Sequence, residues 1–260
     1  MTTFKSLQLN DKLLEALDYM GFEKATPIQE EAIPQILNHK DLLACAQTGT
    51  GKTAAFILPV LHALSNSDNK GGTRALIIAP TRELAIQIDQ QIQGLAYFVD
   101  LTSIAVYGGG DGDDFQTQTN AFKTGVDIIV ATPGKLMSHM NMGYAEMKDL
   151  QFLILDEADR MLDIGFYQDI ISIRKKLPEK LQTLLFSATM PSKIKQLSKQ
   201  ILHQLYVIEL SVSKPAEGVL QAIYLVQDED KTNLLVHLLK GKEEEYQSVI
   251  VFCSTKKAIQ

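Results

Sequence analysis

The sequence predicts an α/β fold in which a mostly parallel β-sheet carries helices on both faces. Short apolar runs rich in β-branched residues alternate along the chain with longer stretches of helical periodicity. Several of these runs are apolar throughout, which is the pattern of strands covered on both faces. The composition, 45% hydrophobic and 22% charged over 260 residues, is typical of globular proteins.

The expected elements follow one another in a regular order. A helix capped by Asn10 or Asp11 ends at Gly21, and a second helix follows the pair Thr26-Pro27. Strands are expected over residues 42–46, 75–79, 103–107, 127–131, 152–155, 183–186 and 206–210. Helical periodicity covers residues 53–64, 83–95 and 191–202. Because strands alternate with helices, neighbouring strands should run parallel.

A change of composition after residue 210 indicates a domain boundary. Residues 1–210 are expected to form one domain, and the small, polar, Pro- and Gly-bearing residues 211–218 to form a linker. Residues 219–260 predict a strand over 222–226, a helix over 231–239 and a strand over 249–253. One such βαβ unit cannot close a core, so this segment is expected to be the truncated start of a second domain.

Composition also excludes several classes of protein. Cys45 and Cys253 lie far apart and the five histidines form no closely spaced pair, so neither a disulfide scaffold nor a zinc site is expected. The longest apolar run, residues 54–61, is too short to span a bilayer, and the N-terminus lacks a signal core. A cytoplasmic protein without a membrane partner is therefore expected. The net charge of −6 means that any nucleic-acid binding must be local.

A glycine-rich segment follows the first expected strand. It consists of Ala46, Gln47, Thr48, Gly49, Thr50, Gly51, Lys52 and Thr53, and matches the phosphate-binding loop except for Ala46 in place of glycine. In such a loop backbone N–H groups surround the phosphates, Lys52 reaches the β and γ oxygens, and the Thr53 hydroxyl ligates magnesium. A glycine-rich strand-to-helix turn is the alternative. The expected strand and helix on either side favour the phosphate loop.

Asp156 and Glu157 follow directly after the apolar run 152–155. In a parallel sheet that edge is where ligands bind. Asp156 could hold the magnesium, usually through water, and Glu157 could orient or deprotonate a water aimed at the γ-phosphate. Two acids favoured by a helix dipole are the alternative. The phosphate-loop pattern favours the catalytic interpretation.

Six motifs, in this order, resemble the DEAD-box RNA helicase family. They are GFEKATPIQ (21–29), AQTGTGKT (46–53), PTRELA (80–85), TPGK (132–135), DEAD (156–159) and SAT (187–189). The resemblance covers residues 4–189, the first RecA-like domain of that family, and residues 249–258 resemble the start of its second. It implies a RecA-like P-loop NTPase domain.

The resemblance assigns residues 1–40 to an adenine pocket. Phe22 would stack on adenine, Gln29 would contact its N6 and N7 edge, and Lys24 belongs to the same segment. Thr26 and Gln29 also form a capping-box pattern, in which the amide satisfies its own helix. Phe4 resembles an aromatic that flanks this pocket in the family, although it could equally be a packing residue.

The resemblance also implies an RNA-binding surface. Its residues are Pro80, Thr81, Arg82, Gly108, Gly109, Thr132, Pro133, Gly134 and Lys135. Capping by Thr81 and a simple turn at residues 132–135 are the alternatives. Lys135 stands where the family usually has Arg, so a point-charge contact to phosphate survives and a bidentate one does not. The acidic residues Asp111, Asp113 and Asp114 are expected in a solvated loop.

The implied catalytic set is Lys52, Asp156, Glu157, Ser187 and Thr189. The Ser187 and Thr189 hydroxyls could link the DEAD residues to the RNA surface, or could cap the helix that begins near residue 191.

The implied activity is that of an ATP-dependent RNA helicase. Such an enzyme binds ATP, Mg²⁺ and RNA, hydrolyses ATP to ADP and phosphate, and remodels RNA duplexes or RNA–protein complexes. A P-loop ATPase that moves on DNA and a nucleotide-dependent RNA clamp are the alternatives. A monomer is expected. Because the family's arginine fingers lie in the second domain, residues 1–260 alone are expected to bind nucleotide with little turnover.

Overall fold

The computed structural model describes residues 2–68, 71–109, 112–143, 145–210, 220, 222–242 and 244–253, without the side chains of residues 112–114. The chain divides into two units, Met1–Ser213 and Lys214–Gln260. The expected linker, residues 211–218, lies outside the described residues.

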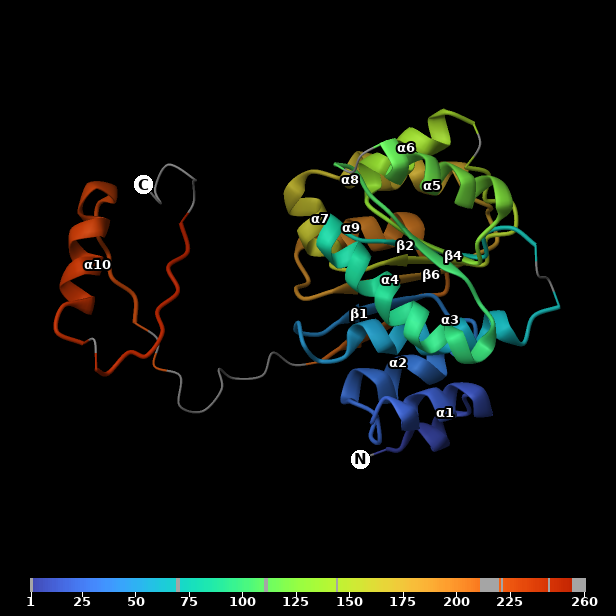
Figure 1. Ribbon diagram of the computed structural model, residues 1–260, viewed down its shortest axis with the longest axis horizontal. Coiled ribbons are helices and arrows are strands. Elements are labelled where there is room, and N and C mark those ends of the chain that lie inside the picture. The colour runs from blue at the N-terminus through green and yellow to red at the C-terminus, as the bar shows by residue number, and fades with distance from the viewer. Residues whose placement is uncertain are drawn as a thin grey trace. The chain divides into compact units, whose positions relative to one another are not determined.

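The first unit is built on a parallel seven-stranded sheet with the order β3-β4-β2-β5-β6-β1-β7 (Figure 1). Its strands are β1 (Leu42–Cys45), β2 (Ala75–Ile78), β3 (Ser103–Val106), β4 (Ile128–Ala131), β5 (Phe152–Leu155), β6 (Gln182–Ser187) and β7 (Tyr206–Glu209). Every pairing in the sheet is parallel. All seven expected strands are present, within one residue at each end, which confirms the predicted fold.

Nine α-helices are described around this sheet. They are α1 (Asp11–Tyr19), α2 (Pro27–Leu37), α3 (Lys52–Ser65), α4 (Arg82–Ala96), α5 (Gly112–Thr124), α6 (Pro133–Asn141), α7 (Ala158–Ile164), α8 (Tyr167–Lys176) and α9 (Ser192–Ile201). Short 3₁₀ turns lie at Phe4–Leu7 and Tyr97–Val99. Asn10 caps α1, accepting the N–H of Leu13 through its side-chain oxygen at 2.9 Å.

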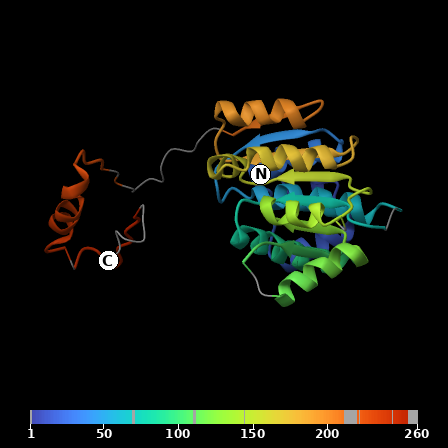
Figure 2. The ribbon, with the colours of Figure 1, turned by 90° about the horizontal axis from the view of Figure 1, so that it is seen from above.

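Alternate strand residues divide the hydrophobic core into two layers, one on each face of the sheet. Ala44, Ile77 and Ile154 face the layer that contains α1 to α4. Leu43, Leu76 and Leu153 face the layer that contains α6 to α9. Figures 1 and 2 show helices on both sides of the strands, as expected for strands that are apolar throughout.

The structure corrects two expectations about loops. Asp113 and Asp114 belong to helix α5 and not to a solvated loop, while Asp111 lies outside the described residues. The expected turn at residues 132–135 is the start of α6, with Pro133 in its first turn. Proline is favoured there because the first N–H groups of a helix have no intrahelical partner.

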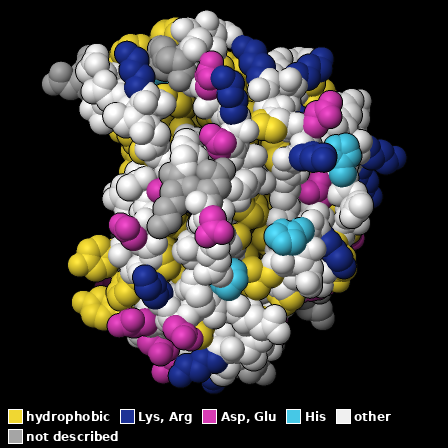
Figure 3. Space-filling model, turned by 90° about the vertical axis from the view of Figure 1, so that its right-hand side faces the viewer, with side chains coloured by type: hydrophobic (Ala, Val, Ile, Leu, Met, Phe, Trp, Pro, Cys, Tyr) yellow, Lys and Arg dark blue, Asp and Glu magenta, His cyan; other side chains and the backbone are white. Residues whose placement is uncertain are grey.

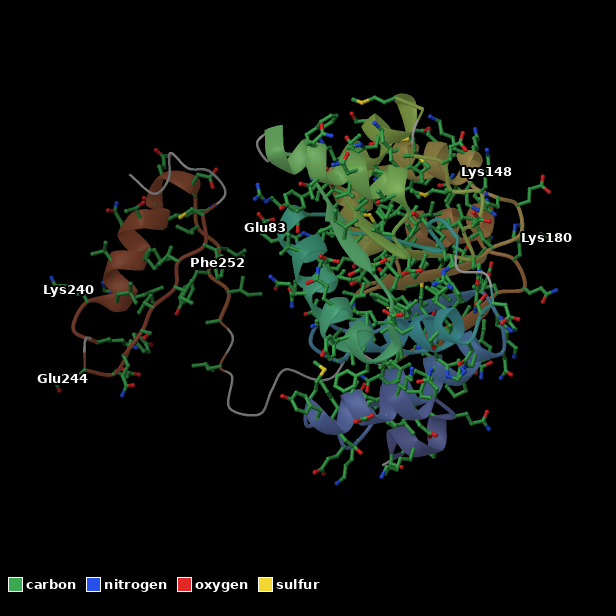
Figure 4. All side chains as sticks on the ribbon, turned by 45° about the vertical axis from the view of Figure 1, so that its right-hand side comes forward. Glu83, Lys148, Lys180, Lys240, Glu244 and Phe252 are labelled. Carbon is green, nitrogen blue, oxygen red and sulfur yellow. The ribbon has the colours of Figure 1, made fainter. Side chains whose placement is uncertain are left out.

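The second unit contains the expected helix, α10 (Lys231–Leu239), after a 3₁₀ turn at Asp228–Asp230. The expected strands over 222–226 and 249–253 are wrong, since the described residues of both segments are neither strand nor helix. An extended segment becomes a strand only through ladder hydrogen bonds to a neighbour. Apolar side chains of these segments are exposed, including Leu225 and Phe252. Figure 4 labels Phe252.

Among the described residues, no helix is both long and apolar enough to cross a bilayer. On the face shown in Figure 3, basic and acidic side chains are interspersed without a large field of one sign.

Candidate active site and nucleic-acid interface

A cavity of about 440 Å³ opens where β1 and β5 end. It is lined by Leu17, Met20, Phe22, Gln29, Thr48, Gly49, Gly51, Lys52, Thr53, Ala54, Ile57, Leu84, Gln87, Gln91, Leu95, Asp156 and Glu157. The cavity therefore brings the glycine-rich loop, the first two DEAD residues and the adenine-pocket segment to one place. Helix α4 also contributes Gln87, Gln91 and Leu95 to the cavity wall. These three residues could not be expected from the sequence, because they belong to no motif.

The glycine-rich loop between β1 and α3 uses its glycines where the backbone requires them. Gly49 and Gly51 both have positive φ, +80° and +90°. A Cβ on Gly51 would collide with the Gln29 side-chain nitrogen, and the φ of +90° would strain any other residue, so glycine is favoured at this position. Gly51 immediately precedes α3, so the N–H groups at the start of that helix point towards the loop.

Lys52 and Thr53 stand at the start of α3 and line the cavity. Lys52 is buried, and its ammonium group donates a hydrogen bond to the carbonyl oxygen of Ala46 at 2.8 Å. The Lys52 ammonium group is therefore bound to a backbone carbonyl of the loop itself. An anion in the loop would offer this ammonium a charged acceptor in place of a carbonyl, and charged acceptors make the stronger bond.

Asp156 and Glu157 follow β5 at the carboxyl edge of the sheet. Asp156 is 3% exposed, and burial raises the pKa of its carboxyl to about 6 against the attraction of Lys52. One of its oxygens accepts the N–H of Glu157 at 2.9 Å. Glu157 occupies the N-cap position of α7 with a left-handed backbone, φ +49°, but forms no side-chain cap; its carboxylate pairs with Arg160 at 3.1 Å. Asp156 and Glu157 therefore lie both at the start of a helix and in the cavity, so the two interpretations of these acids do not exclude each other.

These donors suit magnesium. A hard divalent cation prefers oxygen ligands, and the cavity presents the Asp156 carboxylate and the Thr53 hydroxyl at its loop end. A cation there would also stabilise the ionised form of a carboxyl that burial otherwise protonates. Among the described residues there is no cluster of three or more His, Cys, Asp or Glu that could hold a metal alone. Water molecules and phosphate oxygens could complete the coordination, because protein-bound magnesium usually keeps several waters.

The SAT residues contact the last residue of the DEAD motif. Thr189 donates to the Asp159 carboxylate from its backbone N–H at 2.9 Å and from its hydroxyl at 2.7 Å. Burial acts to raise the pKa of Asp159, but hydrogen bonds from Thr189, Ala188 and Ser187 outweigh it and lower that pKa. The Ser187 hydroxyl also donates to the Thr189 carbonyl at 2.7 Å. The N-cap position of α9 is Pro191, and the Ser187 and Thr189 hydroxyls bond to the Thr189 carbonyl and to Asp159 instead of capping that helix.

The Gln29 amide makes one helix-capping contact and one contact with the glycine-rich loop. Its side-chain oxygen accepts the N–H of Thr26 at 2.9 Å, and its nitrogen donates to the carbonyl of Gly51 at 3.0 Å. Gln29 is 3% exposed yet lines the cavity. It therefore ties the start of α2 to the phosphate loop, and each polar atom keeps one further hydrogen-bonding position.

The two aromatic residues of this segment, Phe22 and Phe4, lie in different environments. Phe22 is 44% exposed at the cavity wall, open to a planar ligand. Phe4 is buried in the core, so the packing alternative describes it. Lys24 is exposed and pairs through its backbone with Thr3 in an isolated bridge.

The residues of the expected RNA surface lie at the ends of β2, β3 and β4, on the same edge of the sheet. Thr81 caps α4, accepting the N–H of Leu84 at 3.3 Å, with Pro80 before it. Arg82 begins that helix at the surface and donates to the carbonyl of Gly109 at 3.2 Å. Figure 4 shows its neighbour Glu83 projecting outward.

After β4 the exposure differs from residue to residue: Gly134 is exposed, Thr132 and Lys135 are half-buried, and Pro133 is buried. Thr132 precedes α6 without a side-chain cap, so the N–H of Gly134 in the first turn has no capping side chain. Gly108 and Gly109 are exposed after β3. Nothing lies within 4 Å of the Cβ position of Gly108 or Gly134, so an elongated ligand could approach the backbone at both.

Three further residues of this surface, Tyr107, Phe115 and His139, belong to none of the sequence motifs. The Arg82 guanidinium lies over the Tyr107 ring and the Lys135 ammonium over the Phe115 ring, each 4.5 Å from the ring centre. His139 stacks on Phe115 with ring centres 5.4 Å apart. The i, i+4 spacing of Lys135 and His139 was the available signal, because it places both on one face of a helix.

Comparisons with known proteins agree with this geometry. The DEAD/DEAH box helicase family model matches residues 26–197. An ATP-dependent RNA helicase CshA of Listeria monocytogenes is 40% identical over 260 residues, which is 100% of this chain and 49% of the relative. A DEAD-box ATP-dependent RNA helicase CshA of Bacillus subtilis is 38% identical over 258 residues, 99% of this chain and 51% of the relative. The chain thus spans about half the length of these curated relatives.

Two solved structures are also similar. A crystal structure of a DEAD box protein from the hyperthermophile Methanococcus jannaschii gives a TM-score of 0.75 at 36% identity, covering 99% of this chain and 68% of that one. A hypothetical ATP-dependent RNA helicase from Sulfolobus tokodaii gives a TM-score of 0.70 at 34% identity, covering 78% of this chain and 57% of that one.

Proposed function

This chain belongs to the DEAD/DEAH box helicase family, and from that membership we propose that the protein is an ATP-dependent RNA helicase. It binds ATP with Mg²⁺ in the 440 Å³ cavity and RNA along the neighbouring sheet edge. The observation that carries the proposal is the meeting of Lys52, Asp156 and Glu157 at the ends of β1 and β5, in one cavity with the glycine-rich loop.

Each residue has a role that its position supports. Lys52 leaves the Ala46 carbonyl and binds the β and γ phosphate oxygens. Asp156 and Thr53 hold the magnesium, which when bound neutralises charge that develops on the phosphates. Glu157 orients the attacking water and accepts its proton. Ser187 and Thr189 act through Asp159, to which Thr189 is bonded, and so connect the DEAD residues to the RNA surface.

The adenine end of the cavity is formed by residues 1–40. Phe22 stacks on the base, and Gln29 uses its two remaining hydrogen-bonding positions on the N6 and N7 edge. Because Gln29 also bonds the Gly51 carbonyl, base recognition is connected directly to the phosphate loop. Lys24 lies on the exposed rim of the same segment.

RNA is bound by the ends of β2, β3 and β4. Pro80 and Thr81 with Arg82, Gly108 with Gly109, and residues 132–135 present helix N-termini, exposed backbone and two cations to successive phosphates. A local arrangement of this kind suits a protein whose net charge is −6. Contacts to 2′-hydroxyl groups would distinguish RNA from DNA.

We further propose that residues 219–260 belong to a second RecA-like domain, joined through residues 211–218, in a cytoplasmic, monomeric protein. That domain would supply the opposite wall of the cleft and the arginine fingers, which contribute about 10³ to 10⁵ in rate. Residues 1–260 alone would then bind nucleotide and turn it over slowly.

The test is an ATPase assay on the whole protein with single-stranded RNA, the matching DNA or neither, with Lys52→Ala as the variant and Lys180→Ala, far from the cavity, as its control. We expect RNA to stimulate turnover, DNA not to, and Lys52→Ala alone to abolish it. Equal stimulation by DNA would indicate a DNA-translocating ATPase. RNA binding without turnover would indicate a clamp.

A further inference from the structure

Two cations of the proposed RNA surface each lie over an aromatic ring. The guanidinium carbon of Arg82 is 4.5 Å from the centre of the Tyr107 ring, and Lys135 Nζ is 4.5 Å from the centre of the Phe115 ring. A cation within about 6 Å of a ring centre is attracted by the ring's quadrupole. Tyr107 directly follows β3 and Phe115 lies in the first turns of α5, so one chain connection supplies both rings.

The Phe115 ring is itself held from below. His139 is 0% exposed and stacks on Phe115, with the ring planes 18° apart and the centres 5.4 Å apart. Phe122 packs on His139 at 5.0 Å. Because Lys135 and His139 are four residues apart on α6, the lysine and the histidine meet the same ring of α5. The four side chains therefore contact one another in the order Lys135, Phe115, His139 and Phe122.

A buried amide joins this stack to the backbone of Tyr107, the residue that carries the other ring. Gln118 of α5 donates to the Tyr107 carbonyl at 3.3 Å, and its oxygen lies 3.2 Å from His139 Nε2. Burial, and secondly the charge of Lys135, lower the pKa of His139 to about 4, so the ring beneath Phe115 is neutral near pH 7. A neutral ring adds no repulsion to the lysine above it.

We propose that Tyr107 and Phe115 are positioning residues for RNA binding, whose rings hold Arg82 and Lys135 in place to contact successive phosphates. The proposal rests on the proposed function. Lysine carries a point charge on a flexible four-carbon chain and lacks the planar fork of arginine. A ring that confines this chain before binding reduces the side-chain entropy lost when the phosphate is bound. Phe115 therefore compensates for a lysine at position 135.

The first test measures RNA affinity of the full chain by fluorescence anisotropy with a labelled oligonucleotide. Phe115→Leu should weaken binding about threefold to tenfold, the range expected for a lost cation–π contact, while Phe115→Tyr, which keeps a ring, should bind within about twofold of the wild type. In a Lys135→Met background, Phe115→Leu should have no further effect. Equal losses for the Leu and Tyr variants, or additive losses in the double variant, would show a packing role only.

A second test needs no RNA. Protons held over a ring face resonate upfield, so the ε-methylene protons of Lys135 should be shifted upfield in the wild type and in Phe115→Tyr, and not in Phe115→Leu. A wild type that binds RNA but lacks this shift would overturn the positioning role. A wild type that shows the shift but binds no RNA at low salt would overturn the proposed RNA surface itself. Melting temperature and ATP affinity, measured on the same variants, report any general loss of structure.

Discussion

Glu157 holds a backbone conformation that is unusual for its residue type. Its φ of +49° is in the left-handed region, which a non-glycine residue occupies at a cost of order 1 kcal/mol. Such strain persists where the surroundings over-determine it, and here β5 and α7 fix the residues on both sides. Glu157 lines the same cavity as Lys52 and Asp156, and its carboxylate pairs with Arg160.

For Glu157→Gln we expect retained ATP binding and turnover reduced at least about a hundredfold, the lower bound for losing a general base. An amide keeps the shape of the carboxylate but cannot accept the proton. The measurement is steady-state ATPase of the whole protein with RNA, alongside nucleotide affinity by calorimetry. Glu179→Gln, an exposed residue beyond α8, is the matched control. Turnover at the wild-type rate would remove Glu157 from the mechanism.

The side-chain amide of Gln29 has two roles, because it caps α2 and also faces the proposed adenine site. Gln29→Ala should reduce the preference for ATP over GTP by about tenfold, as expected for one lost bidentate base contact of roughly 1–3 kcal/mol. Gln35→Ala, on the same helix but outside the cavity, controls for lost helix stability. Calorimetry with ATP and GTP decides between the two roles. Wild-type protein that binds both nucleotides equally would leave capping as the function of Gln29.

At the scale of elements, the helix pair α5 and α6 carries a pH-sensitive contact. The pKa of His139 is lowered from 6.5 to about 4, by burial first and then by the charge of Lys135. Between these values the unfolded chain binds a proton that the folded chain does not. The contribution of His139 to the free energy of unfolding therefore falls as the pH drops from 6.5 to 4, by at most about 1.4 kcal/mol per pH unit.

We expect His139→Phe, which cannot ionise and keeps a ring in the stack, to reduce the loss of melting temperature between pH 6.5 and pH 4. Melting curves at half-unit intervals measure this slope. His39→Asn, at an exposed position with φ +56°, is the control and should leave the slope unchanged. A variant as acid-sensitive as the wild type would place the titrating group elsewhere.

Elements with a strong local pattern could be predicted from the sequence, and those without one could not. β1 and β2 are four-residue apolar strands buried in the sheet, and the phosphate loop follows β1 directly. The polar helix α5 has a mixed sequence, and only packing of Phe122 against the second core layer shows why it forms. The contact of Gln118 with His139 joins residues 21 apart in sequence, and no local periodicity encodes it.

At the scale of the whole molecule, the two units differ in how many described apolar side chains they bury. Both core layers consist of residues between Phe4 and Ile208, all within the first unit. The second unit contains α10, which has no buried residue, and exposed apolar side chains such as Ile223. Among the described residues, the stability that comes from buried apolar area therefore resides in residues 1–210.

Residues 1–210 alone should melt within about 2 °C of the 260-residue chain, because 1 kcal/mol corresponds to about 2–4 °C at this size and every described residue of the two core layers is retained. Their ATP affinity should also be unchanged, since every residue that lines the cavity is retained. Residues 1–203 are the matched control. That shorter chain lacks β7, whose Ile208 is buried and which pairs with β1 along four residues, so it should melt well below the other two. Calorimetric melts of the three chains decide the matter: a large loss in 1–210 would mean that residues 211–260 stabilise the sheet, and no loss in 1–203 would mean that β7 does not.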